Sequence, residues 1–228
     1  MKIHIYYRHT SNNIVGKFRP YWFSYENCFK NLLNTIEGRD NVSLTLAMDG
    51  DVSKDFTFNY KTKYTLFQTN HKSSLKSWRD LMIHVKSQSM DDNDIIYWVE
   101  NDYLHVEDWI DKTIELFSTY QGLEYVSLYD HNDKYFLPMY DNLTSKIITT
   151  NTHHWRTTPS TCGTYMITRK VFEEDYNIWI DAVGDHNTFL DLQEKKNRFV
   201  LTPIPGLSTH CMESLMSPCI DWKKKNYE

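Results

Sequence analysis

Two carboxylates, Glu100 and Asp102, directly follow the apolar run from Ile95 to Val99. Side chains alternate along an extended chain, so residues two positions apart point to the same side if the strand continues. Two carboxylates gathered at the end of a buried strand are costly unless a cation compensates their charge. A divalent metal ion would explain this spacing. The alternative for an isolated Glu-x-Asp triplet is a turn that caps the next helix.

Three further residues with useful chemistry lie near the ends of apolar segments. Asp49 ends the segment VSLTLAMD, Asp185 opens the segment DHNTFLDL, and His210 follows the late apolar run RFVLTPI. Each has a simpler explanation, because Asp-Gly is a common turn pair and aspartate is a common helix cap. Their order along the chain is more informative than any one of them.

The elements that position these residues alternate between strand and helix. Strands are predicted in residues 3–7, 42–49, 64–70, 95–99 and 125–129, in the first part of 162–175, and in 198–206. Helices are predicted in residues 29–36, 75–85, 106–117, the second part of 162–175, and 184–196. Such alternation favours an α/β fold with a mostly parallel central sheet, whose ligands lie beyond the carboxyl ends of the strands. Residues 131–160 are predicted to be irregular and are a candidate substrate loop.

Composition limits the class of protein. The 228 residues suffice for one large domain, and the formal net charge of −5 argues against a nucleic-acid partner. The longest apolar run, Ile95 to Val99, is too short to cross a membrane, and no signal peptide opens the chain, so we expect a cytoplasmic protein. The four cysteines form no CxxC pair, which favours reduced thiols over a structural zinc site.

The order of these motifs resembles the GT-A nucleotide-sugar glycosyltransferases, and most of all the inverting, family-2-like enzymes with a DxD-type motif. YWVENDYL has the form of that motif, AMDGDVSKD is similar to the acidic-glycine segment that holds the nucleoside, and TCGTYMITRKVFEED resembles the segment that faces the donor sugar. The resemblance implies a Rossmann-like three-layer sandwich in a single catalytic domain, residues 1–228. Residues 1–102 would form the nucleotide-sugar-binding half, and residues 103–228 the acceptor-binding and catalytic half.

The resemblance also implies roles for individual residues. The donor would be bound by Tyr7, Arg8, His9, Thr10, Asp49, Glu100, Asn101, Thr161 and Gly163, with Lys72, Arg8 and Arg156 as candidate phosphate partners. Asp102 and His210 would hold Mn²⁺ or Mg²⁺ together with the diphosphate of the donor. Glu100 would bind either this metal or the hydroxyls of the donor's ribose and sugar, and the sequence leaves both roles open.

Asp185 takes the place of the family's catalytic base, where the usual Glu-Asp pair becomes Gly184-Asp185. This departure leaves Asp181 and Asp191 as alternatives. A single base with direct attack implies inversion at the anomeric carbon, which follows from the family and not from spacing. The loop of residues 129–155 is rich in aromatic rings that suit a sugar acceptor. They are Tyr135, Phe136, Tyr140, His153, His154 and Trp155.

The expected function is metal-dependent transfer of a sugar, with inversion, from a nucleoside-diphosphate donor to a hydroxyl of a glycan or similar acceptor. UDP is the family's commonest nucleotide, so we expect a UDP-sugar. A nucleotidyltransferase is one alternative, but it usually has a glycine-rich phosphate loop after the first strand, where this chain has only Gly16. A second is a non-catalytic glycan-binding module on a transferase scaffold. A third is a metal-dependent hydrolase, which would need a richer cluster of His and Asp.

Overall fold

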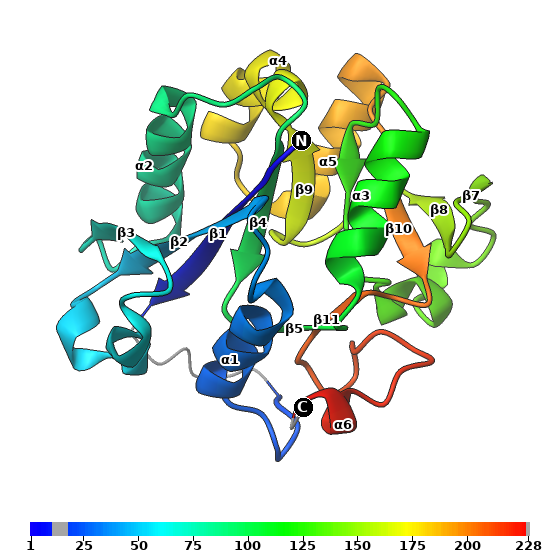
Figure 1. The fold of residues 1–228 in the computed structure, drawn as a ribbon. Coiled ribbons are helices and arrows are strands. Elements are labelled where there is room, and N and C mark those ends of the chain that lie inside the picture. Colours follow the sequence, from blue (N-terminus) through cyan, green and yellow to red (C-terminus); the bar gives the residue numbers. More distant parts are fainter. Residues whose placement is uncertain (11–17, 227–228) are drawn as a thin grey trace.

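The central strands bury side chains on both faces, which is typical of a sheet covered by helices on each side. In β1 (Ile3–Thr10), Ile5 and Tyr7 face one apolar core and Tyr6 faces another; β4 (Ile95–Glu100) divides its side chains in the same way. The computed structural model describes residues 1–10 and 18–226 (Figure 1). The segment with Gly16, on which the nucleotidyltransferase alternative depends, lies outside these residues.

The predicted alternation of strands and helices is confirmed. The other strands are β2 (Val42–Asp49), β3 (Thr65–Thr69), β5 (Tyr103–His105), β6 (Tyr125–Val126), β7 (Ile147–Thr149), β8 (His154–Thr158), β9 (Tyr165–Thr168), β10 (Val200–Ile204) and β11 (Ser208–His210). The helices are α1 (Tyr25–Ile36), α2 (Ser74–Ser87), α3 (Trp109–Thr119), α4 (Arg169–Ile180), α5 (Asp185–Lys196) and α6 (Trp222–Lys225). Four short 3-10 helices connect them: η1 (Val52–Lys54), η2 (Phe56–Tyr60), η3 (Asn132–Tyr135) and η4 (Pro138–Tyr140).

A nine-stranded sheet in the order β3-β2-β1-β4-β9-β6-β10-β8-β7 forms the middle layer. Among the described strands of this sheet, β9 and β8 run antiparallel to the other seven, so the sheet is mostly parallel, as expected. Helices α1 and α3 pack on one face, and α2, α4 and α5 pack on the other (Figure 1). The α/β three-layer architecture predicted from the sequence is therefore confirmed.

Register brings the ends of the first strands together. β1 pairs in parallel with both β2 and β4, with Thr10 opposite Asp49 and Arg8 opposite Glu100. Because parallel strands end at the same edge of a sheet, the polar side chains that follow each apolar run gather there. This edge is where the candidate site lies.

Two features of the fold were not predicted. Strands β5 and β11 form a small antiparallel sheet that pairs Tyr103 with His210, and this pairing places His210 next to the end of β4. Residues 131–160, expected to be irregular, contain β7 and β8, which extend the edge of the main sheet. Both pairs consist of three- to five-residue strands, which are too short for a clear periodic signal.

Within residues 1–10 and 18–226, no helix is long and apolar enough to cross a membrane. All four cysteines are free thiols, and the Sγ atoms of Cys28 and Cys211 lie 3.9 Å apart.

Candidate active site

A cleft of about 260 Å³ opens at the carboxyl ends of β1, β2 and β4, beside the first turn of α2. Part of its wall is apolar and comes from Ala47, Phe67 and Leu81. Seven of the residues predicted to bind the donor line this single cavity: Arg8, His9, Thr10, Asp49, Lys72, Glu100 and Asn101. The structure thus brings together residues from four separate segments of the chain.

Asp49 organises the loop that leads into α2. Its carboxylate accepts hydrogen bonds from the backbone N–H groups of His71, at 2.7 Å, and Ser73, at 3.2 Å. Burial alone would raise the pKa of Asp49, but the hydrogen bonds from this loop outweigh burial and lower it. Between these two donors, Lys72 has a φ of 51°, in the left-handed region that residues other than glycine seldom adopt. Asp49 therefore fixes the backbone that carries Lys72 into the cleft.

His9 and Asn101 form the floor of the cleft near the end of β4. The side-chain amide of Asn101 donates to His9 Nδ1 at 2.8 Å, and His9 Nε2 lies 3.0 Å from Asp55 Oδ2. This pattern assigns the proton of the neutral imidazole to Nε2, which donates to Asp55. Tyr7, predicted to contact the nucleotide, is fully buried instead, and its hydroxyl donates to the backbone oxygen of Asn101 at 3.1 Å. It supports the floor from the core side and does not line the cleft.

Arg8, Glu100 and Asp185 converge on Gly163. A Cβ added to Gly163 would lie 3.4 Å from Arg8 Nη1, 3.4 Å from the Glu100 carboxyl carbon and 3.5 Å from Asp185 Oδ2. Arg8 is also 3.9 Å from Glu100 Oε1, and its guanidinium lies over the ring of Trp78. A cation, two carboxylates and a residue without a side chain thus meet beside the cleft that Arg8 and Glu100 line.

The two carboxyl groups at this junction are harder to ionise than usual. Burial and the nearby charge of Asp102 raise the pKa of Glu100, while Arg8 opposes the shift. Asp185 is exposed as a whole residue, but desolvation of its carboxylate by the surrounding chain raises its pKa, with Arg8 and a backbone hydrogen bond from Gly163 opposing the shift. Gly184, whose φ is 91°, is the N-cap of α5, so Asp185 is not the capping residue and its carboxylate is directed at Gly163. A carboxylate with a raised pKa in a cleft suits general-base chemistry.

Asp102 occupies different surroundings from Glu100. β4 ends at Glu100 and the chain turns at Asn101 and Asp102, so the extended conformation that would align the two carboxylates does not persist. The buried Asp102 Oδ2 accepts a hydrogen bond from Arg19 Nη2 at 2.6 Å and lies 3.1 Å from His210 Nε2. The His210 ring stacks on Tyr103, with ring centroids 5.1 Å apart.

The expected metal set does not fit this arrangement. Asp102 and His210 contact each other directly, but an arginine holds the same carboxylate oxygen, and Glu100 lies beside Arg8 and Gly163. Among residues 1–10 and 18–226, no group of three His, Cys, Asp or Glu side chains is arranged to hold a metal ion. The roles of Glu100, Asp102 and His210 as ligands of Mn²⁺ or Mg²⁺ remain predictions that this geometry does not support.

A second cavity, of about 330 Å³, lies on the other side of Asp185. Its lining includes Thr161 and His186 and one member of the predicted acceptor wall, Tyr140. The other members lie elsewhere: Trp155 is fully buried in the core, and Tyr135 donates a hydrogen bond to Asp130. The rest of that wall is thus not part of this cavity.

Arg156, a predicted phosphate partner, does not line the cleft at the ends of β1, β2 and β4. It is buried and pairs with Asp130 at 2.8 Å. Arg19 was not singled out from the sequence, because only the folded chain brings it next to Asp102 and the backbone oxygen of Cys211. No local motif marks such a long-range pair.

The layered sheet, its strand order and the cleft at the carboxyl ends of its strands match the GT-A, Rossmann-like fold. No protein-family model and no curated protein sequence matches the chain. Among solved structures, TarS 1-349 from S. aureus is similar with a TM-score of 0.54 and 9% identity, over 89% of this chain and 58% of its own. The complex of the same TarS region with UDP-GlcNAc gives a TM-score of 0.53 at 10% identity, over 89% and 56% of the two chains.

A structure of CMP:2-keto-3-deoxy-manno-octonic acid synthetase complexed with CTP is also similar, with a TM-score of 0.51 and 12% identity over 90% of this chain and 92% of its own. These identities are low, so the similarities establish the fold. The chain spans little more than half the length of the TarS chains that it matches.

Proposed function

We propose that the protein transfers a sugar from a nucleoside-diphosphate donor, with UDP as the expected nucleotide, to a hydroxyl group of an acceptor glycan or similar molecule. The observation that carries this proposal is the convergence of Arg8, Glu100 and Asp185 on Gly163, beside the donor cleft. The binding of UDP-GlcNAc by TarS, which shares the fold, supports the choice of donor class.

The cleft supplies what a nucleotide sugar requires. Its apolar wall suits a nucleobase, and the loop fixed by Asp49 presents Lys72 and the hydroxyl of Ser74 near Arg8, which donates to Ser74 Oγ at 3.1 Å. Arginine and lysine are the side chains that bind phosphate oxygens most strongly. Glu100 would then accept hydrogen bonds from sugar hydroxyls. Within residues 1–10 and 18–226, the cleft is lined by residues numbered from Arg8 to Asn101, which supports assigning donor binding to the first half of the chain.

Transfer proceeds by one displacement. The acceptor oxygen forms a bond to the anomeric carbon while the bond from that carbon to the diphosphate oxygen breaks, and the nucleoside diphosphate leaves as an anion. Arg8 and Lys72 stabilise the negative charge that develops on this leaving group. Asp185 takes the proton of the attacking hydroxyl, which contributes about 10²- to 10⁴-fold to the rate. A single displacement inverts the anomeric centre.

Asp181 and Asp191 have weaker support as the base. Asp181 pairs with Arg79, and Asp191 pairs with Lys195. Neither lines the donor cleft or the cavity beside Asp185. Of these three aspartates, Asp185 lines the second cavity and also lies beside Gly163, next to Arg8 and Glu100.

The test is release of UDP from a panel of UDP-sugars in the presence of mixed glycan acceptors, compared between wild type, Asp185→Asn and Asp191→Asn. We expect Asp185→Asn to lose about 10²- to 10⁴-fold in turnover while binding UDP normally, and Asp191→Asn to behave as wild type. Equal turnover in wild type and Asp185→Asn would assign the base elsewhere.

Nucleotidyl transfer is the second candidate, and the similarity to the CTP-bound synthetase over nearly the whole of both chains favours it. In that reaction a sugar acid or sugar phosphate attacks the α-phosphate of a nucleoside triphosphate, and pyrophosphate leaves. Pyrophosphate release from CTP in the presence of a sugar acid, without any turnover of UDP-sugars, would favour this candidate.

A further inference from the structure

The cavity on the far side of Asp185 carries a set of polar groups that the donor does not use. It is lined by His131, Asp133, Lys134 and Tyr140 from the segment around η3 and η4, and by Ser160 and His186 from near α5. Asp185 also lines it. The cavity therefore lies on the side of the base from which an attacking hydroxyl would come.

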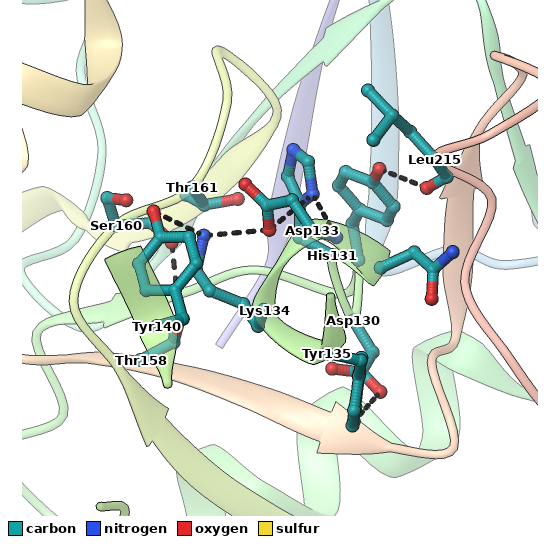
Figure 2. A network of polar contacts seen from close by, with 12 residues as sticks. Asp130, His131, Asp133, Lys134, Tyr135, Tyr140, Thr158, Ser160, Thr161 and Leu215 are labelled. Carbon is teal, nitrogen blue, oxygen red and sulfur yellow. Dashed lines mark hydrogen bonds and ion pairs between the residues drawn. The ribbon is translucent and has the colours of Figure 1, made fainter. Parts of the chain in front are cut away.

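A buried lysine is the central group of this cavity. Only 3% of the Lys134 side chain is exposed, and its Nζ donates to Asp133 Oδ1 at 3.0 Å and to the Tyr140 hydroxyl at 3.1 Å. The ammonium also lies 4.2 Å from the centroid of the Tyr140 ring. Figure 2 shows Lys134 between these two partners, with Ser160 and Thr161 beside them. Burying a lysine is costly, so its position in the lining needs an explanation.

The charges of the lining do not favour an anion. Lys134 is balanced by Asp133, whose carboxylate also lies 2.7 Å from His131 Nδ1. Burial lowers the pKa of His131, although Asp133 opposes the shift, so this imidazole is neutral near pH 7. With Asp185 ionised as the base, the cavity carries no excess positive charge. A phosphate or carboxylate would be repelled by Asp133 and Asp185.

A neutral group with many hydroxyls matches the same lining. Asp133 and Asp185 accept hydrogen bonds from hydroxyl groups, Lys134 donates to them, and the Ser160 hydroxyl, 2.8 Å from His186 Nδ1, can do both. Tyr140 is half-buried and offers an aromatic surface that suits the C–H face of a sugar ring. Such mixed polar and aromatic linings fix orientation as well as affinity.

We propose that this cavity is an acceptor subsite for a neutral polyhydroxylated group, a sugar ring or a polyol, and that Lys134 and Tyr140 position its hydroxyl toward Asp185. The inference rests on the proposed sugar transfer, because it assigns the second substrate of that same reaction. Lys134 and Tyr140 act as positioning and specificity residues, while Asp185 handles the proton.

The test is saturation-transfer NMR with UDP present and four probes: methyl glucopyranoside, glucitol, glucose 6-phosphate and glucosamine. We expect the two neutral probes to bind and the phosphate to bind more weakly or not at all. Lys134→Met and Tyr140→Ala should weaken neutral probes about tenfold or more, because each loses contacts within the subsite. Leu143→Ala is the matched control, since Leu143 follows the same segment, is 37% exposed and does not line the cavity. Calorimetric titration with UDP measures the donor cleft separately.

Preferential binding of glucose 6-phosphate or glucosamine would overturn the inference, as would neutral probes that bind equally well to Tyr140→Ala. Absence of probe binding while UDP still binds would overturn it too, and would leave donor binding intact. If UDP itself does not bind wild type, the proposed function fails instead. Should Lys134→Met not fold, Tyr140→Ala and Tyr140→Phe decide the question, because Tyr140 is only half-buried.

Discussion

Replacing Arg19 by methionine tests how the charge of Asp102 is compensated. Arg19 Nη2 lies 2.6 Å from Asp102 Oδ2, and the two side chains are only 14% and 3% exposed. The same guanidinium donates to the backbone oxygen of Cys211 at 2.8 Å, and it lies over the ring of Phe23. Methionine keeps much of the apolar stem but removes the charge and both hydrogen bonds.

The expected loss follows from burial. Removing one partner of a buried ion pair costs about 3 to 5 kcal/mol, since a charge remains in a poorly solvated place. We take the lower value, about 3 kcal/mol, because His210 still contacts Asp102 in the variant. For a chain of this size, each 1 kcal/mol shifts the midpoint of thermal unfolding by about 2 to 4 °C, so the midpoint should fall by roughly 6 to 12 °C.

The assay is thermal unfolding by circular dichroism, with urea unfolding as a second measure of the free energy of unfolding. Arg79→Met is the control: Arg79 pairs with Asp181 at 3.1 Å, but both side chains are exposed, so it should cost less than about 1 kcal/mol. The double variant Arg19→Met with Asp102→Asn should recover part of the loss. Equal, small losses in Arg19→Met and Arg79→Met would refute the conclusion that Arg19 compensates Asp102.

Three further predictions concern the junction of the two cavities. The rate of sugar transfer should fall at low pH, because Asp185 must be ionised to accept a proton. The fall should be centred on a pKa above 3.8, the ordinary value for aspartate, and a pH–rate profile measures it. A rate that stays constant down to pH 4 would contradict this prediction. Gly163→Ala should leave the midpoint of thermal unfolding nearly unchanged, since the new methyl group makes ordinary contacts of 3.4 to 3.5 Å. The variant should transfer sugar more slowly, because the methyl group fills the space between Arg8, Glu100 and Asp185. Full activity would show that the reaction does not use this space. Glu100→Gln should raise the midpoint of thermal unfolding at pH 7.5, because a carboxyl group whose pKa is raised by folding destabilises the folded state once it ionises. The variant should lose this advantage below pH 4.5, the ordinary pKa of glutamate, where the wild-type carboxyl is protonated in both the folded and the unfolded state. A lower midpoint for the variant at pH 7.5 would show that the pairing of Glu100 with Arg8 dominates.

Most strands of the main sheet, and their order along the chain, could be predicted because the sequence signals of these strands are local. The apolar runs that become β1, β2 and β4 end in Arg8, Asp49 and Glu100, and parallel strands necessarily bring such ends to one edge. Two neighbouring serines could cap α2, and the structure selects Ser73, whose side chain accepts from the Lys76 N–H. Seven of the predicted donor residues line one cleft because they lie near the carboxyl ends of strands that meet at the same edge.

The remaining features depend on contacts between distant segments. The turn at Asn101 and Asp102 separates two carboxylates that an extended strand would have aligned, and a turn of two residues leaves little trace in periodicity. Arg19 meets Asp102 across 83 positions of sequence, so no motif could indicate the pair. Tyr7 alternates to the core side of β1, whereas Arg8 next to it faces the cleft. Only the register of the folded sheet decides such questions.

Calorimetric titration of the protein with UDP and GDP, with Mn²⁺ and then with a chelator, tests the central claim most directly. The claim is that a nucleoside diphosphate binds in the cleft at the carboxyl ends of β1, β2 and β4, whose lining residues are numbered from Arg8 to Asn101. We predict saturable binding of at least one of the two nucleotides, weakened about tenfold or more in Arg8→Met by loss of a charge-assisted contact and unchanged in Arg79→Met. Absence of binding by both nucleotides under every condition, or equal affinity in wild type and Arg8→Met, would contradict the account.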